Sequence, residues 1–185
     1  EYGLHFPSSG VIDSHEFMSS LLNDATNNGS DIAYKVEITS INQINNGYEI
    51  IAIDSDLNRI RFTTDILINS SGLFAKNISD MVGIIDPKYD IEYWKGEYFS
   101  LSNGKEKFIS RLIYPLPEKH NIGLGIHTTT DISGRLKLGP NSFKLKNQIL
   151  DYSVNANHKS DFYNSIKDFL PFINIDDLHP DYSGI

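Results

Sequence analysis

Residues 98–140 read YFSLSNGKEKFISRLIYPLPEKHNIGLGIHTTTDISGRLKLGP, and this stretch decides the fold. Short runs of β-branched and aromatic residues alternate with turn residues, a pattern typical of consecutive antiparallel strands. Asn103-Gly104 is a strong signal for a hairpin turn. The expected strands are residues 98–101, 111–114, 123–129 and 135–138.

The third of these strands carries the most informative side chains. Successive residues of a strand face opposite sides of the sheet, so the alternation places His127 on one face and Ile126 on the other. The face of His127 also carries Gly123, Gly125 and Thr129. Two glycines beside a histidine leave a hollow where another backbone or a flat ligand can approach. We therefore expect a functional site on this face.

Composition narrows the class of protein. The formal net charge of −8 argues against a nucleic-acid partner, because phosphate binding needs a basic surface. The one basic cluster, residues 135–146, is expected to protect an edge strand with lysines. The chain has no cysteine, so disulfides, thiolate metal sites and cysteine nucleophiles are excluded. No apolar run is long enough for a transmembrane helix, and we expect a cytoplasmic location.

Helical periodicity predicts one helix near each end of the chain. Asp13 precedes Glu16 by three residues, which is a capping-box pattern, and an apolar stripe follows at helical spacing. Gly29 is expected to end this helix in the left-handed conformation. Near the other end, residues 162–170 are amphipathic and stop at Pro171.

The part of the chain before residue 83 combines a meander with a strand, a turn and a helix. Residues 32–41, 48–53 and 59–62 predict a three-stranded meander, because turn residues separate them. The apolar run at 65–69 is typical of a parallel strand covered on both faces. A small-residue turn and a helix at 74–82 follow. Such a unit directs backbone N–H groups at whatever lies above the strand, for example a phosphate or a polar ring edge.

The pattern changes near Gly83 to consecutive antiparallel strands, and we place a domain boundary there. The predicted domains are residues 1–83 and residues 84–185. The expected fold class is α+β, with an α/β part that contains the meander and a second part built on an antiparallel sheet. The chain opens on Glu1 and stops at Ile185 in what looks like continuing sequence, so we expect a piece of a longer protein.

Several strings of residues, taken together, resemble one known family. The chain is similar to the FAD-dependent oxidoreductases of the D-amino-acid-oxidase/glycine-oxidase superfamily, and most similar to the branch that includes L-2-hydroxyglutarate dehydrogenase. The matching strings are PSSGVIDSHEFM (7–18), INSSGLFA (68–75), KGEYFSL (95–101), RLIYPLPE (111–118), LGIHTTTDISGRLKLGP (124–140) and PDYSGI (180–185).

This resemblance implies an FAD-binding domain and a substrate domain whose large antiparallel sheet lies over the flavin. Members of the family begin with a G-x-G-x-x-G turn that holds the ADP half of FAD, and this sequence contains no such motif. Gly123-Leu124-Gly125 lies between strands and opens no helix, so we reject it as a nucleotide motif. The family's final flavin-contacting segment is also absent, and we expect a middle fragment of an enzyme.

The resemblance implies roles for four polar residues. It places His127 in the active-site strand, where a histidine can take the hydroxyl proton of a substrate; the alternative is a histidine that is hydrogen-bonded within the sheet. Arg111 can clamp a substrate carboxylate, or it can form a salt bridge at a strand edge. Tyr98 and Tyr114 can bind a carboxylate or wall the pocket, although buried tyrosines most often pack and find one partner.

The resemblance also implies cofactor contacts made through the backbone. The family approaches the flavin at the turn after the short strand, which requires small side chains there. Each position has a structural alternative: a core position of the meander for Ile38, and an ordinary surface loop for residues 7–10. The predicted FAD contacts are Ser71, Gly72, Leu73, Ile38, Ser9 and Gly10.

The remaining histidines and one acidic pair receive no functional role. Asp176 and Asp177 are expected to be solvated charges in a turn. The other histidines show no metal-ligand spacing, so we expect no metal. They are His5, His15, His120, His158 and His179.

Two hypotheses follow from the sequence. The first is FAD-dependent oxidation of a small L-2-hydroxy acid such as 2-hydroxyglutarate, with amino-acid or amine oxidation as the alternative on the same scaffold. The second is a truncated or split-gene chain that folds but does not catalyse by itself. Such a chain binds FAD poorly and associates with a complementary chain or with itself. The expected partner of the enzyme is a small molecule, and not a nucleic acid.

Overall fold

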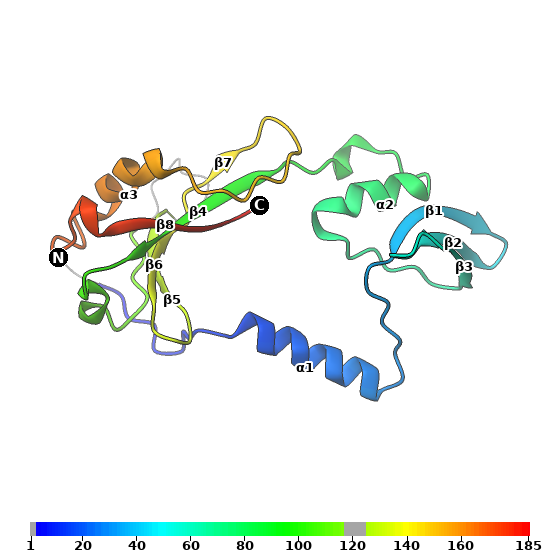
Figure 1. Cartoon of the computed structure of the whole chain (residues 1–185), viewed down its shortest axis with the longest axis horizontal. Coiled ribbons are helices and arrows are strands. Elements are labelled where there is room, and N and C mark those ends of the chain that lie inside the picture. The colour runs from blue at the N-terminus through cyan, green and yellow to red at the C-terminus, as the bar shows by residue number, and fades with distance from the viewer. Residues whose placement is uncertain (1–2, 117–124) are drawn as a thin grey trace. The chain divides into compact units, whose positions relative to one another are not determined.

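A computed structural model describes residues 3–116 and 125–185 of the chain. The chain divides into two compact units, which we describe separately (Figure 1). Leu22–Glu92 form the meander unit, and Glu1–Leu21 together with Tyr93–Ile185 form the large-sheet unit. This division differs from the predicted one, because residues 84–92 fall in the meander unit and the first 21 residues fall in the large-sheet unit. The mixture of helices and antiparallel sheets agrees with the predicted α+β class.

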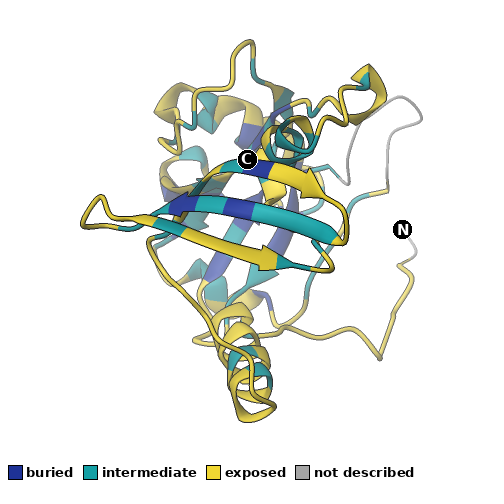
Figure 2. Ribbon diagram, turned by 90° about the vertical axis from the view of Figure 1, so that its right-hand side faces the viewer, coloured by how far each residue is buried: buried dark blue, intermediate teal, exposed yellow. Residues whose placement is uncertain are grey.

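The meander is present as predicted. Its strands are β1 (Glu37–Ile44), β2 (Gly47–Ile53) and β3 (Arg59–Thr64), and β2 pairs antiparallel with both neighbours. Strand β1 begins at Glu37, five residues later than expected from the sequence. Figure 2 shows the central strand with intermediate and buried residues only, and the two edge strands largely exposed. The apolar residues buried in this sheet are Ile41, Ile50 and Ala52.

Helix α1 (Ser14–Asn27) begins where the capping pattern predicts. The Asp13 carboxylate accepts hydrogen bonds from the backbone N–H groups of His15 (2.9 Å) and Glu16 (3.1 Å), which satisfies two of the helix's orphan donors. Gly29 follows at φ 85°, the left-handed conformation that commonly ends a helix. No residue of α1 is buried, so the apolar stripe is present but lies exposed.

The predicted parallel strand at residues 65–69 is not present. No strand is assigned there, and Ile66 and Ile68 are 76% and 81% exposed. A strand exists only when a neighbour completes its hydrogen bonds, and no strand among the described residues pairs with this run. The expected turn and helix do follow, as a 3-10 turn η1 (Gly72–Phe74) and helix α2 (Ala75–Met81). A further 3-10 turn, η2 (Pro87–Tyr89), lies near the end of the unit.

The large-sheet unit is built around β4 (Trp94–Leu101). Strand β6 (Leu136–Gly139) pairs antiparallel with β4, and β5 (His127–Thr130) pairs with β6. Strand β8 (Leu178–Gly184) also pairs with β4, and β7 (Phe143–Lys144) pairs with the first two residues of β4. The predicted hairpin through residues 131–134 is therefore confirmed as β5–β6.

One face of this sheet forms the hydrophobic core. Burial alternates along β4, with every second residue buried, as the period of a strand requires. Helix α3 (Lys159–Ile166) packs on this face and buries Phe162, whose ring lies 4.5 Å from that of Phe99. The amphipathic pattern predicted for this segment is confirmed. Two 3-10 turns flank the helix, η4 (Ala156–His158) and η5 (Ile175–Asp177).

Two strand predictions in the decisive stretch are wrong. Asn103 and Gly104 do form a left-handed turn, with φ 64° and 72°, but a 3-10 turn, η3 (Lys105–Phe108), follows instead of a returning strand. Residues 111–114 are not assigned as a strand. Ile113 nevertheless exchanges hydrogen bonds with Thr128, from the Thr128 N–H to the Ile113 carbonyl (3.0 Å) and from the Ile113 N–H to Thr128 Oγ1 (2.6 Å). The side-chain hydroxyl replaces one ladder bond, so the pairing is irregular.

Asp177 is buried, so the prediction of a solvated charge is wrong for this residue. Asp177 is 4% exposed, and its carboxylate lies 2.6 Å from the Lys105 ammonium. It also accepts hydrogen bonds from the Asn103 amide and from the Asn174 N–H, each at 2.7 Å. Burial raises the pKa of Asp177, but these donors and the charge of Lys105 outweigh burial and lower the pKa to about 2. The residue ties the end of β4 to the segment before β8.

Candidate active site

The second face of the large sheet, opposite the core, brings His127 and Tyr98 into one row. His127 of β5 pairs with Gly139 of β6. Phe99 of β4 pairs with Leu138 of β6. The preceding residue of β4, Tyr98, therefore lies beside the following residue of β6, Gly139. A Cβ atom added to Gly139 would lie 2.8 Å from Tyr98 Cδ1. The tyrosine ring therefore lies over the glycine, and the first row of this open face runs from His127 through Gly139 to Tyr98.

The row continues onto β8 through a second tyrosine. The rings of Tyr98 and Tyr182 stack with centroids 4.6 Å apart and planes within 9°. Burial raises the pKa of Tyr98 to about 12, helped by interactions with the phenols of Tyr182 and Tyr114. Tyr98 is therefore a neutral hydrogen-bonding group at physiological pH. Tyr98 packs against another ring, as the alternative of a packed tyrosine predicts, and it lies close enough to Tyr114 for the two phenols to interact.

His127 is held in one tautomer by its own strand. It is 7% exposed, and its Nδ1 lies 2.9 Å from the Gly125 carbonyl oxygen. Because a carbonyl only accepts, Nδ1 donates, and Nε2 is left as the lone-pair nitrogen of the neutral ring. The Tyr114 ring stacks on the imidazole at 4.3 Å and 22°. Tyr114, which is half exposed, thus covers one side of His127.

The hollow predicted beside His127 is partly filled. Gly125 has φ 71°, and a Cβ added there would meet only Pro115 Cγ, at 3.5 Å, which is an ordinary contact. Gly123 lies outside the described residues. The close approach that glycine permits on this face occurs instead at Gly139, under Tyr98.

A second row on the open face carries a lysine. Thr129 pairs with Lys137, and Lys137 pairs with Ser100. Strand β6 lies between β5 and β4, so the expectation that lysines here protect an edge strand is wrong for Lys137. Its ammonium lies 4.4 Å from the centroid of the Tyr182 ring and 4.0 Å from Asp181 Oδ2. The two rows are thus connected through Tyr182.

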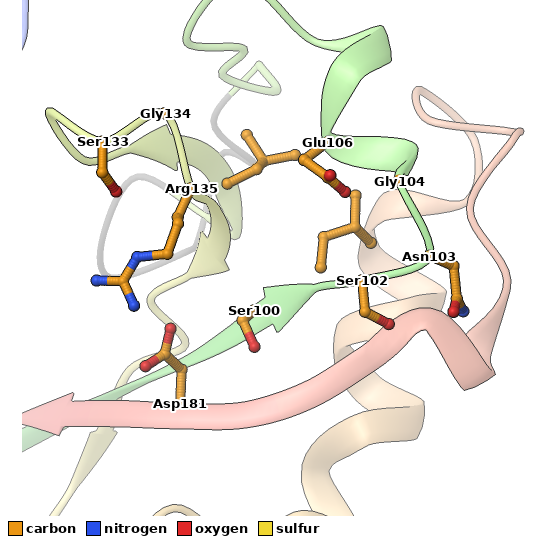
Figure 3. A pocket seen from close by; sticks show the side chains of 11 residues that line it. Ser100, Ser102, Asn103, Gly104, Glu106, Ser133, Gly134, Arg135 and Asp181 are labelled. Carbon is orange, nitrogen blue, oxygen red and sulfur yellow. The ribbon is translucent and has the colours of Figure 1, made fainter.

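A polar pocket of about 480 Å³ lies beyond the second row, where β4 ends and β6 begins (Figure 3). In Figure 3 the guanidinium of Arg135 and the carboxylate of Asp181 point toward one another. Arg135 also donates to Asp131 Oδ2 at 2.9 Å. Glu106 lines the same pocket, and its Oε2 is buried without a hydrogen-bond partner in the part of the chain that the structure describes.

Arg111 and the first loop lie in the same unit but outside the two rows. The exposed guanidinium of Arg111 contacts the His5 ring, and it forms no ion pair with a carboxylate of the residues that the structure describes. Ser9 closes a turn by donating its N–H to the Phe6 carbonyl (3.4 Å). A Cβ added to Gly10 meets nothing within 4 Å, so its backbone is open to a ligand.

The other predicted cofactor residues belong to the meander unit. Ser71 donates its N–H to Asn69 Oδ1 at 3.2 Å. Gly72 has φ 55° and no atom within 4 Å of an added Cβ, and Leu73 follows it in η1. Ile38 pairs with Ala52 next to an irregularity of β1. Within this unit, the open backbone at Gly72 fits contact with a flavin ring, whereas the sequence contains no glycine-rich turn for the pyrophosphate. The residues of the meander unit therefore fit part of an FAD site.

The sequence interpretation missed the contacts that three residues make in the structure. Tyr182 was quoted only as part of the string PDYSGI, Lys137 was assigned to an edge strand, and His158 received no role. The His158 Nδ1 lies 2.5 Å from Glu97 Oε2, and Glu97 is 1% exposed. Strand alternation puts Lys137 on the face of His127 once the β5–β6 hairpin is accepted, so this residue could have been found.

Two classes of site receive no support from the described residues. Residues 3–116 and 125–185 contain no group of three or more histidine and acidic side chains able to hold a metal ion. No helix within these ranges is long and apolar enough to cross a membrane.

Several known proteins are similar to this chain in sequence or in fold. The mitochondrial L-2-hydroxyglutarate dehydrogenase of Arabidopsis thaliana is 28% identical over 97% of this chain and 44% of its own length. The L-2-hydroxyglutarate dehydrogenase of Escherichia coli is 29% identical over 86% of this chain and 35% of its own length. The FAD-bound L-α-glycerophosphate oxidase of Mycoplasma pneumoniae has a TM-score of 0.70 at 18% identity, over 90% of this chain and 42% of that protein.

The chain shares its fold with a further solved structure and matches one protein family over its whole length. The glycine oxidase of Geobacillus kaustophilus shares the fold with a TM-score of 0.62 at 17% identity, over 90% of this chain and 40% of that protein. The family described as FAD dependent oxidoreductase matches residues 1–185. The chain belongs to this family, whose members use FAD. It spans less than half the length of the curated relatives named above.

Proposed function

We propose that the protein oxidises a small L-2-hydroxy acid, with FAD as the electron acceptor, on the open face of the large sheet. The observation that carries the proposal is His127, whose Nδ1 is committed to the Gly125 carbonyl and whose Nε2 is therefore the basic nitrogen. The relatives named L-2-hydroxyglutarate dehydrogenase support 2-hydroxyglutarate, a five-carbon diacid, as the substrate.

The chemistry needs a base beside a C–H bond that gives up a hydride. His127 Nε2 takes the proton of the substrate hydroxyl, and the electrons of that O–H bond form the carbonyl of a 2-oxo acid. The C2–H bond breaks, and its hydrogen leaves with both electrons. FAD, when bound, supplies the two-electron acceptor. Tyr114 holds the imidazole plane by stacking, and Tyr98 stays protonated and can donate a hydrogen bond to the substrate.

The substrate carboxylate needs a cation or several donors. We propose Arg111 for this role, because a guanidinium binds a carboxylate through two parallel hydrogen bonds. The contact between Arg111 and His5 supports an arginine that the first loop holds in place. Backbone at Ser9, Gly10, Ser71, Gly72, Leu73 and Ile38 is proposed to contact FAD.

The decisive test is His127→Gln in the FAD-loaded protein, with His15→Gln as the matched control on the exposed surface of α1. Flavin reduction by 2-hydroxyglutarate is followed under anaerobic conditions. Loss of a general base lowers the rate about 10²–10⁴-fold, whereas His15→Gln leaves it unchanged. An undiminished rate in His127→Gln would overturn the assignment of the base. Reduction by amino acids but not by hydroxy acids would favour the alternative of amine oxidation.

The second proposal, a chain that is folded but needs a complementary chain, has its own observation. Ile66 and Ile68 form an exposed apolar run, and exposed apolar surface of this kind commonly marks an interface. Gel filtration and light scattering of the purified chain test self-association. A monomer that gains catalytic activity with FAD alone would contradict this second proposal.

A further inference from the structure

One charged residue on the open face has no part in the chemistry proposed above. Lys137 lies one row away from His127 on the same face of the sheet. Its nearest carboxylate oxygen among the described residues is Asp181 Oδ2, at 4.0 Å. A charge-assisted hydrogen bond spans about 2.7–2.9 Å, so this separation is too long for one. The ammonium has donors to offer to an anion on this face.

We propose that Lys137 binds the distal carboxylate of the substrate and so selects diacids over monoacids. The inference rests on the proposed oxidation of a 2-hydroxy acid at His127. Tyr182 positions the lysine, because its ring lies 4.4 Å under the ammonium and is itself stacked on Tyr98. Contacts therefore run without interruption from the row of His127 to the lysine.

The spacing of the rows agrees with a five-carbon diacid. Two residues along an antiparallel strand cover about 6.8 Å, which is the offset between the row of His127 and the row of Lys137. From the reacting carbon to a carboxylate oxygen three carbons further on is roughly 5 Å, and a hydrogen bond adds about 2.8 Å. The substrate is therefore long enough to cover the offset of one row along the strand direction.

The same arithmetic disfavours the other basic residue on this face. Arg135 lies two rows from His127, roughly 13.6 Å along the strand, beyond the reach of a five-carbon acid. Its guanidinium also has a carboxylate partner, Asp131 Oδ2 at 2.9 Å. The polar pocket beside Arg135 is thus expected to lie outside the volume that the substrate occupies.

The test is a titration of the 185-residue chain with acids of graded length, followed by NMR signals of the His127 ring and the Lys137 side chain. The ligands are the five-carbon monoacid 2-hydroxypentanoate and the 2-hydroxy diacids of four, five and six carbons. The five-carbon diacid should bind about tenfold more tightly than the monoacid, as expected for one charged hydrogen bond. Lys137→Met should reduce this ratio to about one, and Lys137→Arg should keep most of it. Lys167→Met, at an exposed position directly after α3, should leave the ratio unchanged.

The outcomes separate this inference from the proposed function. Equal binding of monoacid and diacid, or a preference that survives Lys137→Met, overturns the role of Lys137 and leaves the proposed oxidation intact. A preference for the six-carbon diacid that disappears in Arg135→Met also overturns it, and places the distal carboxylate in the pocket. If no hydroxy acid of either kind shifts the His127 signals, the proposed function fails and the inference fails with it.

Discussion

At the scale of single residues, the open face separates a proton acceptor from a proton donor. His127 presents Nε2 because Gly125 occupies Nδ1, while Tyr98 keeps its phenolic proton because burial and two neighbouring phenols raise its pKa to about 12. The two groups lie on β5 and β4, on either side of Gly139 of β6. The histidine can accept a proton, and the tyrosine can donate a hydrogen bond. Such a pair suits a substrate hydroxyl that loses its proton while its oxygen is held by a hydrogen bond.

The raised pKa of Tyr98 predicts that, in a spectrophotometric pH titration, one tyrosine ionises at higher pH than exposed tyrosines do. Most exposed tyrosines ionise near pH 10, whereas one phenol should remain protonated until the pH reaches about 12. Tyr98→Phe should remove this late step and leave the earlier ones in place. Tyr34→Phe, a change at an exposed residue, is the control and should leave the late step in place. A late step that persists in Tyr98→Phe would show that burial does not protect this phenol.

At the scale of elements, Gly139 decides how closely β4 and β6 approach on the open face. Gly139 has φ 141°, and an added Cβ would lie 2.7 Å from the Glu97 carbonyl oxygen and 2.8 Å from Tyr98 Cδ1. Gly139→Ala should therefore destabilise the fold by about 3 kcal/mol, through backbone strain and displacement of its neighbours. Gly134→Ala has a similar backbone penalty at φ 80° but meets no atom within 4 Å, and should cost about 1 kcal/mol.

Urea unfolding of both glycine variants measures the difference. Tyr98 should also lose its stacking on Tyr182 in Gly139→Ala, which near-ultraviolet circular dichroism would report. Equal destabilisation by the two substitutions would mean that the close approach over Gly139 contributes nothing to stability.

Asp177 links two elements through charge, and this link depends on pH. Its pKa of about 2 in the folded chain lies below the usual 3.8, so folding favours the ionised form. The resulting stability, on the order of 1–2 kcal/mol, is fully present above about pH 4 and is lost as the pH falls toward 2. Asp177→Asn should therefore be less stable than the natural chain at neutral pH, and the difference should shrink in acid.

The neighbouring Asp176 provides the control for that experiment, because it is exposed. Asp176→Asn should unfold at the same urea concentration as the natural chain at neutral and at acidic pH. A constant difference between Asp177→Asn and the natural chain across this pH range would contradict the ion pair with Lys105.

The elements that could be predicted from the sequence are those whose determinants lie within them. Helix α1 carries its own cap at Asp13, the meander carries its own turns, and the β5–β6 hairpin carries its turn at residues 131–134. The prediction of a strand at residues 65–69 was wrong, because apolar residues indicate burial but do not provide a neighbouring strand. Asp177 misled for a similar reason, since Lys105 approaches it from a distant part of the chain.

The site was predictable to the same degree. His127 and Tyr98 were expected on functional grounds, and strand alternation fixes the face on which His127 lies. Tyr182 could not be placed, because its stacking on Tyr98 depends on an irregular register between β4 and β8, at Glu97 and Phe99. No local pattern in either strand reports that register.

At the scale of the whole molecule, the proposed contacts to FAD divide unequally between the flavin ring and its ADP half. Gly72, one of the proposed flavin contacts, has open space beside its backbone. The sequence lacks the G-x-G-x-x-G turn through which a helix N-terminus holds a pyrophosphate. Affinity for FAD should therefore come from the flavin ring rather than from its ADP half.

This imbalance predicts that the 185-residue chain barely distinguishes FAD from riboflavin. Both share the flavin ring, and only FAD carries the pyrophosphate and adenine, so their dissociation constants should agree within about tenfold, or 1.4 kcal/mol. Flavin absorbance after gel filtration and fluorescence quenching on titration measure the two affinities. Gly72→Val, which fills open space beside the proposed ring contact, should weaken both ligands alike. FAD binding a hundredfold tighter than riboflavin would mean that residues other than a glycine-rich turn hold the pyrophosphate.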